Sequence, residues 1–293
     1  MSLLITTPLR SGDLLDHYRI ECLVGSGGMA SIFRATDTKT GRPVAIKTLH
    51  PDTAGNGSIF NRFRSEIEIG RRLNHRGLVK MLSDGNAGQR YAVMEWVEGK
   101  PLRELIEEHS KLPIERATRI ALAICETLEY VHAQGVVHRD LKPDNIIVDP
   151  EDNIKLMDFG IARETRANLW NRVKRQQVMG TPDYVSPEQI KGKCVDARSD
   201  VYCLGVMLFE MLTGEVPFSG LDPLAAMNLR LLVDPPDPCE INPAISSRLQ
   251  SIVQRALERD PADRYPSARE FASGLSESLA EEMSQPLELL AGF

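Results

Sequence analysis

The feature that most constrains the fold of this chain is the segment 138–145, which reads His-Arg-Asp-Leu-Lys-Pro-Asp-Asn. An apolar-periodic stretch typical of a helix ends before it at Gly135, and the strand-like run Ile146–Val148 follows it. We therefore expect a loop held at both ends by secondary structure, and loops of that kind position chemical groups. Taken alone, Asp140 would be an ordinary turn or capping residue. The charge density of the whole segment favours a functional loop.

Further motifs flank this loop in a fixed order. The glycine-rich turn Gly25–Ala30 and the run Val44–Lys47 precede it, and Asp158–Gly160 and Ser186–Glu188 follow it. Each motif is weak by itself, but their order is a joint constraint that chance rarely satisfies.

In this order the motifs resemble those of the protein kinase family, over roughly residues 18–275. A narrower resemblance to the Hanks-type serine/threonine kinases of bacteria is carried by Gly27–Met29, Ser186–Gln189 and Asp196–Tyr202. The resemblance implies an α+β, bilobal protein kinase-like fold. Its small N-lobe would be rich in β-strands and carry helix C, and its larger C-lobe would be mainly α-helical.

The domain boundaries follow from composition and from the resemblance. Residues 1–17 mix Thr, Ser, Pro and Gly without a clear period, which predicts a loose leader. The kinase domain is expected at 18–275, with the N-lobe at 18–96 and the C-lobe at 97–275. Residues 276–293 are expected to form an amphipathic helical tail.

Composition excludes several classes of protein. With 293 residues, of which 42% are hydrophobic and 26% charged, the chain can bury a substantial core. A net charge of −6 with scattered basic residues argues against binding nucleic acid. The five cysteines are odd in number, far apart and without a Cys-x-x-Cys pair, so we expect free thiols in a reducing cytosol.

No segment reaches the roughly 20 apolar residues that a membrane-spanning helix needs. The most apolar run, Val201–Leu212, is interrupted by Glu210 and predicts a buried core helix. Met1–Leu9 lacks the basic start of a signal peptide. We therefore expect a cytoplasmic protein without a membrane segment, whereas many relatives of this resemblance carry an anchor after the kinase domain.

Lys47 ends the apolar strand Val44–Ile46, which should bury it, and a buried lysine is costly unless it is paired. The next stretch, 60–73, has helical apolar spacing, and the resemblance to helix C implies that Glu66 is the partner. Glu68 is the competing candidate, although it should face another side of the helix. The alternative is a surface salt bridge of little consequence.

The resemblance also implies a nucleotide site. Met94 would be the gatekeeper, and backbone groups of Glu95 and Val97 would bind the adenine edge. The adenine faces would lie between apolar side chains expected to be core in any case: Val24, Ile32, Ala45 and Ile147. Glycines allow the backbone to approach phosphates closely, so the phosphates would meet Gly25, Ser26, Gly27, Gly28, Met29 and Ala30. Ala30 stands where the family has a third glycine, and it should stiffen the tip.

Implied catalytic roles follow the family pattern. Asp140 would accept the proton of a substrate hydroxyl, Lys142 would neutralise the moving γ-phosphoryl group, and Lys47, held by Glu66, would anchor ATP. Asn145 and Asp158 would hold Mg²⁺, with Mn²⁺ as an alternative, because both offer oxygen ligands. Two structural supports are also implied: an ion pair between Glu188 and Arg264, and Asp200 as a brace for the catalytic loop.

The expected function is therefore a serine/threonine protein kinase of bacterial signal transduction, with protein substrates and autophosphorylation. Lys142 in its motif, together with Thr181, favours serine and threonine over tyrosine acceptors. One rival is a nucleotide-sensing pseudokinase, although no residue needed for transfer is missing. Another is a small-molecule phosphotransferase of related fold, which would usually lack features such as Arg139 and Ser186–Glu188.

Two further hypotheses concern regulation. Gly70 lies one turn after Glu66, and the resemblance implies that it stacks with Met81, Phe159 and His138. A helical glycine costs about 1 kcal/mol relative to alanine and would leave the stack unfilled. Helix C would then be loosely held and braced from outside, for example by a homodimer formed through the N-lobe.

The second hypothesis concerns residues 166–180, which contain no Ser, Thr or Tyr where relatives carry activating phosphothreonines. Arg139 would then lack its usual phosphate partner. This stretch is either a solvated basic loop or a short helix in which Trp170 packs against the kinase or a partner. Thr165 and Thr181 are the remaining acceptors in the segment, and Thr165 should be dispensable.

Overall fold

The structure is a computed structural model that describes residues 9–51, 56–83, 91–159 and 182–284. The described residues form two compact units. The first contains those up to Gly99 together with Met157, Asp158 and Phe159. The second contains Lys100–Leu156 and the described residues after 181. The stretch 166–180, which contains Trp170, and the two candidate acceptors Thr165 and Thr181 lie outside the described residues.

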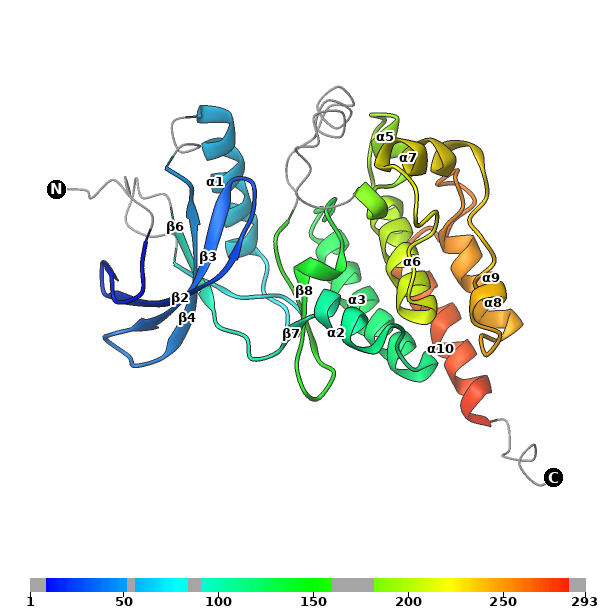
Figure 1. Ribbon diagram of the computed structural model, residues 1–293, viewed down its shortest axis with the longest axis horizontal. Coiled ribbons are helices and arrows are strands. Elements are labelled where there is room, and N and C mark those ends of the chain that lie inside the picture. The colour runs from blue at the N-terminus through cyan, green and yellow to red at the C-terminus, as the bar shows by residue number, and fades with distance from the viewer. Residues whose placement is uncertain (1–8, 52–55, 84–90, 160–181, 285–293) are drawn as a thin grey trace. The chain divides into compact units, whose positions relative to one another are not determined.

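The first unit is built on an antiparallel sheet with one helix against it (Figure 1). The sheet order is β1-β2-β3-β4-β6-β5. Its strands are β1 (Leu14–Leu15), β2 (Tyr18–Ser26), β3 (Ala30–Asp37), β4 (Pro43–Leu49), β5 (Met81–Ser83) and β6 (Tyr91–Glu95). Helix α1 (Gly57–Arg72) begins at Asn56, whose side chain accepts hydrogen bonds from the N–H groups of Ser58 and Ile59.

Strand alternation gives this sheet two buried faces. One face forms a cluster that includes Tyr18, Phe33, Ile46 and Val93. The other face packs on α1 through the cluster Ala30, Leu49, Phe63, Ile67 and Ala92. The helix predicted over 60–73 is therefore the one that closes the second face of the sheet.

The segment predicted to be a loose leader is in part structured. Leu14 and Leu15 pair with Arg19 and Tyr18 as strand β1, and Leu15 is buried. The Tyr91 hydroxyl donates a hydrogen bond to the Asp16 carboxylate. Sequence patterns miss such an element because two residues are too few to show a period. Residues 1–8 lie outside the described part of the chain.

The second unit is mainly helical, with a small sheet in the order β7-β8-β9. The strands are β7 (Lys100–Pro101), β8 (Ile146–Val148) and β9 (Ile154–Leu156). The helices are α2 (Leu102–His109), α3 (Ile114–Ala133), η1 (Pro143–Asn145), η2 (Pro182–Tyr184), α5 (Pro187–Ile190), α6 (Ala197–Thr213), α7 (Pro223–Leu232), α8 (Pro238–Ile241), α9 (Ser247–Ala256) and α10 (Ala268–Ser284).

Helix α6 forms the centre of the second unit. It contacts α3, α9 and α10 (Figure 1), and every residue from Ser199 to Thr213 is buried. This is the core helix that the apolar run predicted. No helix in the described ranges is both long and apolar enough to cross a lipid bilayer.

Helix α10 runs without interruption through the boundary proposed at residue 275. Leu275 and Ser278 are both buried, and the Ser246 hydroxyl lies 3.0 Å from Glu282 Oε1. The described part of the proposed tail, up to Ser284, is thus the end of a packed helix.

Candidate active site

In the first unit, Lys47 is the buried centre of a charged cluster. Its residue exposure is 6%, and its Nζ lies 2.5 Å from Glu66 Oε1 and 2.7 Å from Asp158 Oδ1. Burial by itself lowers the pKa of Lys47, but Asp158 and Glu66 outweigh it, so the net pKa is raised and the lysine stays charged. Burial also raises the pKa of Glu66 to about 7, although the Lys47 ammonium opposes the rise. The predicted pairing of Lys47 with Glu66 is present, and Asp158 adds a second carboxylate.

The competing candidate on α1 points elsewhere. The Glu68 side chain is 65% exposed and pairs with Arg64 at 3.4 Å. A surface pair of this kind contributes little, which leaves Glu66 as the partner of Lys47.

Asp158 has a left-handed backbone, with φ of +60°. Aspartate tolerates this region better than most residues, but the conformation is uncommon and is typical of functional sites. Phe159, which follows it, is buried. Gly160, the third residue of the motif, lies outside the described residues.

The expectation of an unfilled space beside Gly70 is wrong. A Cβ built at Gly70 would lie 3.2 Å from Met81 Cε, so the methionine side chain already occupies this volume. The glycine allows the close approach of Met81 to α1, and Met81 packs against the cluster that contains Phe63 and Ile67. This packing weakens the argument that α1 is loosely held.

In the second unit, Asp200 organises the loop that carries Asp140. This carboxylate is fully buried; its Oδ2 accepts from the His138 N–H at 2.8 Å and its Oδ1 from the Arg139 N–H at 2.9 Å. His132 Nε2 lies 2.8 Å from the same Oδ2. The predicted brace is thus confirmed. His132 is a further partner of this brace.

The loop has a strained turn at its second residue. Arg139 has φ of +68°, and Gln189 Nε2 donates to its carbonyl oxygen at 2.8 Å. Gln189 Oε1 also accepts from the Ser186 N–H at 3.0 Å. Sequence reasoning used Gln189 only as part of a motif, whereas the structure shows that it ties α5 to the loop. The Arg139 Nε is buried without a hydrogen-bond partner among the described residues.

Asp140, Lys142 and Asn145 lie together at the end of this loop. The Asp140 side chain is 53% exposed, and its Oδ2 lies 3.1 Å from Lys142 Nζ and 3.2 Å from Asn145 Nδ2. Asn145 Nδ2 also donates to the Asp140 carbonyl at 2.8 Å. Because the amide nitrogen points at Asp140, the amide oxygen of Asn145 points away from it. This orientation fits an oxygen ligand for a divalent cation.

A buried ion pair fixes α5 against the end of the unit. Arg264 Nη1 and Nη2 lie 2.9 and 2.8 Å from the two oxygens of Glu188, and Ser199 Oγ donates to the same carboxylate. Arg264 also donates to three backbone carbonyls, those of Arg198, Glu258 and Arg259. Burial opposes ionisation of Glu188, but Arg264 outweighs it and lowers the pKa of the carboxyl. The pair implied by the resemblance is present.

A second buried network had no signal in the sequence. Arg103 Nη1 lies 2.6 Å from Glu210 Oε1, and the Tyr184 hydroxyl donates to Glu210 Oε2 at 2.5 Å. Arg103 also donates to the Tyr184 hydroxyl and approaches Asp144 at 3.8 Å. These residues are far apart in sequence, and no local pattern links them.

The residues proposed to sandwich the adenine differ in burial. Ala45 and the gatekeeper candidate Met94 are buried, as expected. Val24 is 53% exposed, so the expectation that it belongs to the core is wrong. The reason is local, because register shifts in the β2–β3 pairing flank this part of β2. Ile32 and Ile147 are half-buried.

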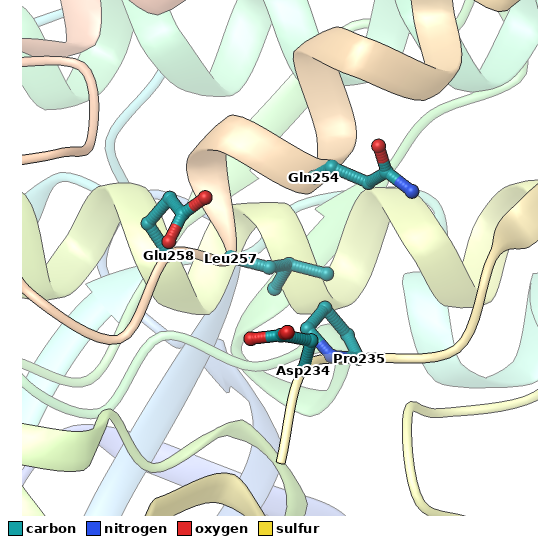
Figure 2. Close-up of a pocket in the computed structure, with 5 residues that line it drawn as sticks. All are labelled: Asp234, Pro235, Gln254, Leu257 and Glu258. Carbon is teal, nitrogen blue, oxygen red and sulfur yellow. The ribbon is translucent and has the colours of Figure 1, made fainter.

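A surface pocket on the second unit contains none of the predicted site residues. Figure 2 shows its lining residues, which are Asp234, Pro235, Gln254, Leu257 and Glu258. Asp234 also pairs with Arg259 at 3.0 Å.

The fold defines a protein kinase domain, together with the cluster of Lys47, Glu66 and Asp158 and the loop that carries Asp140, Lys142 and Asn145. Residues 18–273 match the protein kinase domain family. The chain is 37% identical over 276 residues to serine/threonine-protein kinase PknB of Mycobacterium tuberculosis, covering 92% of this chain and 44% of that protein. It is 41% identical over 260 residues to the probable serine/threonine-protein kinase SCO3848 of Streptomyces coelicolor, covering 87% of this chain and 39% of that protein.

Solved structures agree with this assignment. The Mycobacterium tuberculosis PknI kinase domain aligns with a TM-score of 0.72 at 28% identity, covering 92% of this chain and 100% of that domain. The chain therefore belongs to the protein kinase family, and within it to the Hanks-type serine/threonine kinases of bacteria. It spans about two fifths of the length of the curated relatives it matches, 39% and 44% of the two above.

Proposed function

We propose that this chain is a serine/threonine protein kinase that transfers the γ-phosphoryl group of ATP to protein hydroxyls, its own included, in bacterial signal transduction. The observation that carries the proposal is the arrangement around Asp140. The exposed Asp140 carboxylate lies beside the Lys142 ammonium, on a loop whose backbone N–H groups donate hydrogen bonds to the buried Asp200. Such a carboxylate suits proton transfer from a substrate hydroxyl.

The chemistry at the acceptor follows from these groups. Asp140 takes the hydroxyl proton as the acceptor oxygen bonds to the γ-phosphorus, while the bond from that phosphorus to the β–γ bridging oxygen breaks and ADP leaves. Lys142 stabilises the charge on the moving phosphoryl group. Lys142 and Asn145 both donate hydrogen bonds to Asp140 Oδ2, which orients the carboxylate on the loop.

Lys47 and the glycine-rich tip, both in the first unit, would hold the phosphates of the nucleotide. Lys47, kept charged between Glu66 and Asp158, would bind the α- and β-phosphates. The glycine-rich tip would cover the phosphates, while Met94, Val97 and the four apolar residues Val24, Ile32, Ala45 and Ile147 would surround adenine. The Glu95 N–H donates to the Lys80 carbonyl at 2.9 Å, so any adenine contact of Glu95 would use its own carbonyl.

Asn145 and Asp158 would hold the divalent cation, for which Mg²⁺ is the first choice and Mn²⁺ the second. When bound, such a cation neutralises charge on the β- and γ-phosphates. The orientation of the Asn145 amide supports this assignment.

We further propose a cytoplasmic location and a homodimer formed through the first unit. The location is supported by the five cysteines, all of them free. The dimer is supported by large apolar side chains exposed on this unit, among them Leu14, Leu23 and Leu82.

One experiment separates the three candidate functions. The protein is incubated with γ-labelled ATP and Mg²⁺ or Mn²⁺, together with a generic basic protein and a panel of small alcohols. The kinase proposal expects label on serine and threonine of the basic protein and of the chain itself. Label confined to small alcohols would support a small-molecule phosphotransferase, and ATP binding without transfer would support a pseudokinase.

A further inference from the structure

Three side chains meet at the glycine-rich tip, where β2 and β4 end and β3 begins. Ser26 is the last residue of β2, it pairs in register with Ser31 of β3, and His50 directly follows β4. His50 Nε2 lies 2.9 Å from Ser31 Oγ and 3.3 Å from Ser26 Oγ, and the two hydroxyls are 3.1 Å apart. We call Ser26, Ser31 and His50 the Ser-His-Ser clasp. One imidazole thus joins both strands of the hairpin to the strand that carries Lys47.

The backbone reinforces the same connection. The His50 N–H donates to the Met29 carbonyl at 2.9 Å, and the Gly27 N–H donates to the Ala30 carbonyl at 2.9 Å. The Met29 side chain packs against the cluster that includes Phe63 on α1. The tip is therefore closed on itself and attached to β4 and, through Met29, to α1.

The glycines of the tip are not required by packing. A Cβ added at Gly25 or Gly28 would meet no atom of the described residues within 4 Å, and one at Gly27 would reach only the Ala30 carbonyl, at 3.8 Å. A run of glycines in open space has many accessible conformations, and a ligand that binds it must order them. Bonds that hold the hairpin in one conformation before binding reduce that cost.

We propose that His50 is a positioning residue for nucleotide binding, which acts through Ser26 and Ser31 to hold the glycine-rich tip in the conformation that meets the phosphates. The inference rests on the proposed function, in which this tip binds ATP. His50 itself does not contact the nucleotide. Its loss should weaken ATP binding and leave the transfer step nearly intact.

The expected size follows from the bonds that are lost. A hydrogen bond of ordinary net strength changes an equilibrium by about fivefold. His50→Ala and Ser31→Ala should each raise the Kd and KM for ATP by about that factor, with kcat within about twofold of wild type. The double variant should be weaker by less than the product of the two single effects, because both single variants lose the contact between His50 and Ser31. His50→Gln should recover part of the affinity, because a glutamine amide reaches the position of Nε2.

The chain offers matched controls at the opposite end of the same strands. His17 precedes β2, and Thr40 lies in the turn between β3 and β4, where its hydroxyl donates to Asp37 at 2.9 Å. His17→Ala and Thr40→Ala remove a histidine and a bonded hydroxyl from the same sheet, away from the tip. Both should leave the ATP Kd unchanged.

The test measures ATP binding by calorimetry with Mg²⁺, steady-state kinetics, thermal unfolding, and hydrogen exchange of the amides of residues 25–31 without nucleotide. The proposal expects faster exchange and weaker ATP binding in the His50 and Ser31 variants alone, at unchanged melting temperature. Unchanged amide exchange and an unchanged Kd for ATP in these variants would overturn the proposal. A large loss of kcat together with a lower melting temperature would also overturn it, because that result would indicate a purely structural role for His50. If the wild-type chain does not bind ATP, the proposed kinase function is wrong. The hydrogen-exchange data then still decide whether His50 orders the glycine-rich tip.

Discussion

The buried pair of Glu188 and Arg264 allows a quantitative prediction about stability. Glu188→Gln keeps the shape of the side chain and removes its charge, which leaves the Arg264 guanidinium without a counter-ion. Arg264→Met keeps the aliphatic volume and removes the charge together with every donor. Both residues are almost fully buried, at 5% and 1% exposure, so solvent cannot compensate for either loss.

The two variants should differ in a defined order. Breaking a buried ion pair costs about 3–5 kcal/mol because an uncompensated charge remains. Glu188→Gln should fall near the lower end, about 3 kcal/mol, because an amide oxygen still accepts from Arg264. Arg264→Met should cost at least about 5 kcal/mol, because it also leaves the carbonyls of Arg198, Glu258 and Arg259 without their donor.

Urea unfolding at pH 7.5 measures these free energies, provided that the m-value is unchanged. The exposed pair of Arg248 with Glu277 is the control, and Arg248→Met should cost less than about 1 kcal/mol. The pKa of Glu188 is lowered in the folded state, so its contribution is complete above the ordinary carboxyl pKa of 4.5 and is lost as pH falls through the lowered value. Wild type and Glu188→Gln should therefore converge in acid. A smaller loss in Arg264→Met than in Glu188→Gln would refute the reasoning.

Three further predictions follow from the first unit. Asp16→Ala should lower the free energy of unfolding, measured in urea, by about 1–2 kcal/mol, because it removes the acceptor of the buried Tyr91 hydroxyl. An unchanged free energy would show that the segment before β2 is dispensable for stability. Gly70→Leu should lower rather than raise kinase activity, because a Cβ at position 70 would lie 3.2 Å from Met81 Cε. Adding Met81→Ala should recover part of the lost activity. A gain of activity in Gly70→Leu alone would show that the space beside Gly70 is unfilled. The kcat/KM for ATP should fall as pH drops below about 7, because Glu66 then takes up a proton and no longer forms an ion pair with the buried Lys47. Glu66→Gln should flatten this pH dependence. Identical pH profiles for wild type and Glu66→Gln would contradict the assigned cause.

Much of the fold could be predicted because the relevant signals are local. The helical spacing over residues 60–73 corresponds to α1, and the apolar run Val201–Leu212 is the buried core of α6. The need for a carboxylate beside Lys47 followed from the cost of burying a lysine, and the resemblance to helix C implied that Glu66 supplies it.

The remaining features depend on contacts that local patterns do not encode. Gln189 reaches the Arg139 carbonyl, and Arg103 meets Glu210, across long stretches of sequence. Val24 carries the apolar character of a core residue and is exposed, because its burial depends on the bulged pairing of β2 with β3. Gly70 shows the same limit, since only the position of Met81 reveals whether the space beside it is filled.

The central claim is that Asp140 accepts the proton of the substrate hydroxyl, and Asp140→Asn tests it most directly. General-base catalysis contributes about 10²–10⁴-fold, so γ-phosphoryl transfer to a basic protein should fall at least 100-fold. The Kd for ATP and the melting temperature should stay at their wild-type values, because the substitution removes charge from an exposed position and no volume from the core. Asp144→Asn, on the same loop and equally exposed at 53%, is the matched control and should keep most activity. If Asp140→Asn retained a tenth or more of wild-type turnover, the assignment of the base would be wrong.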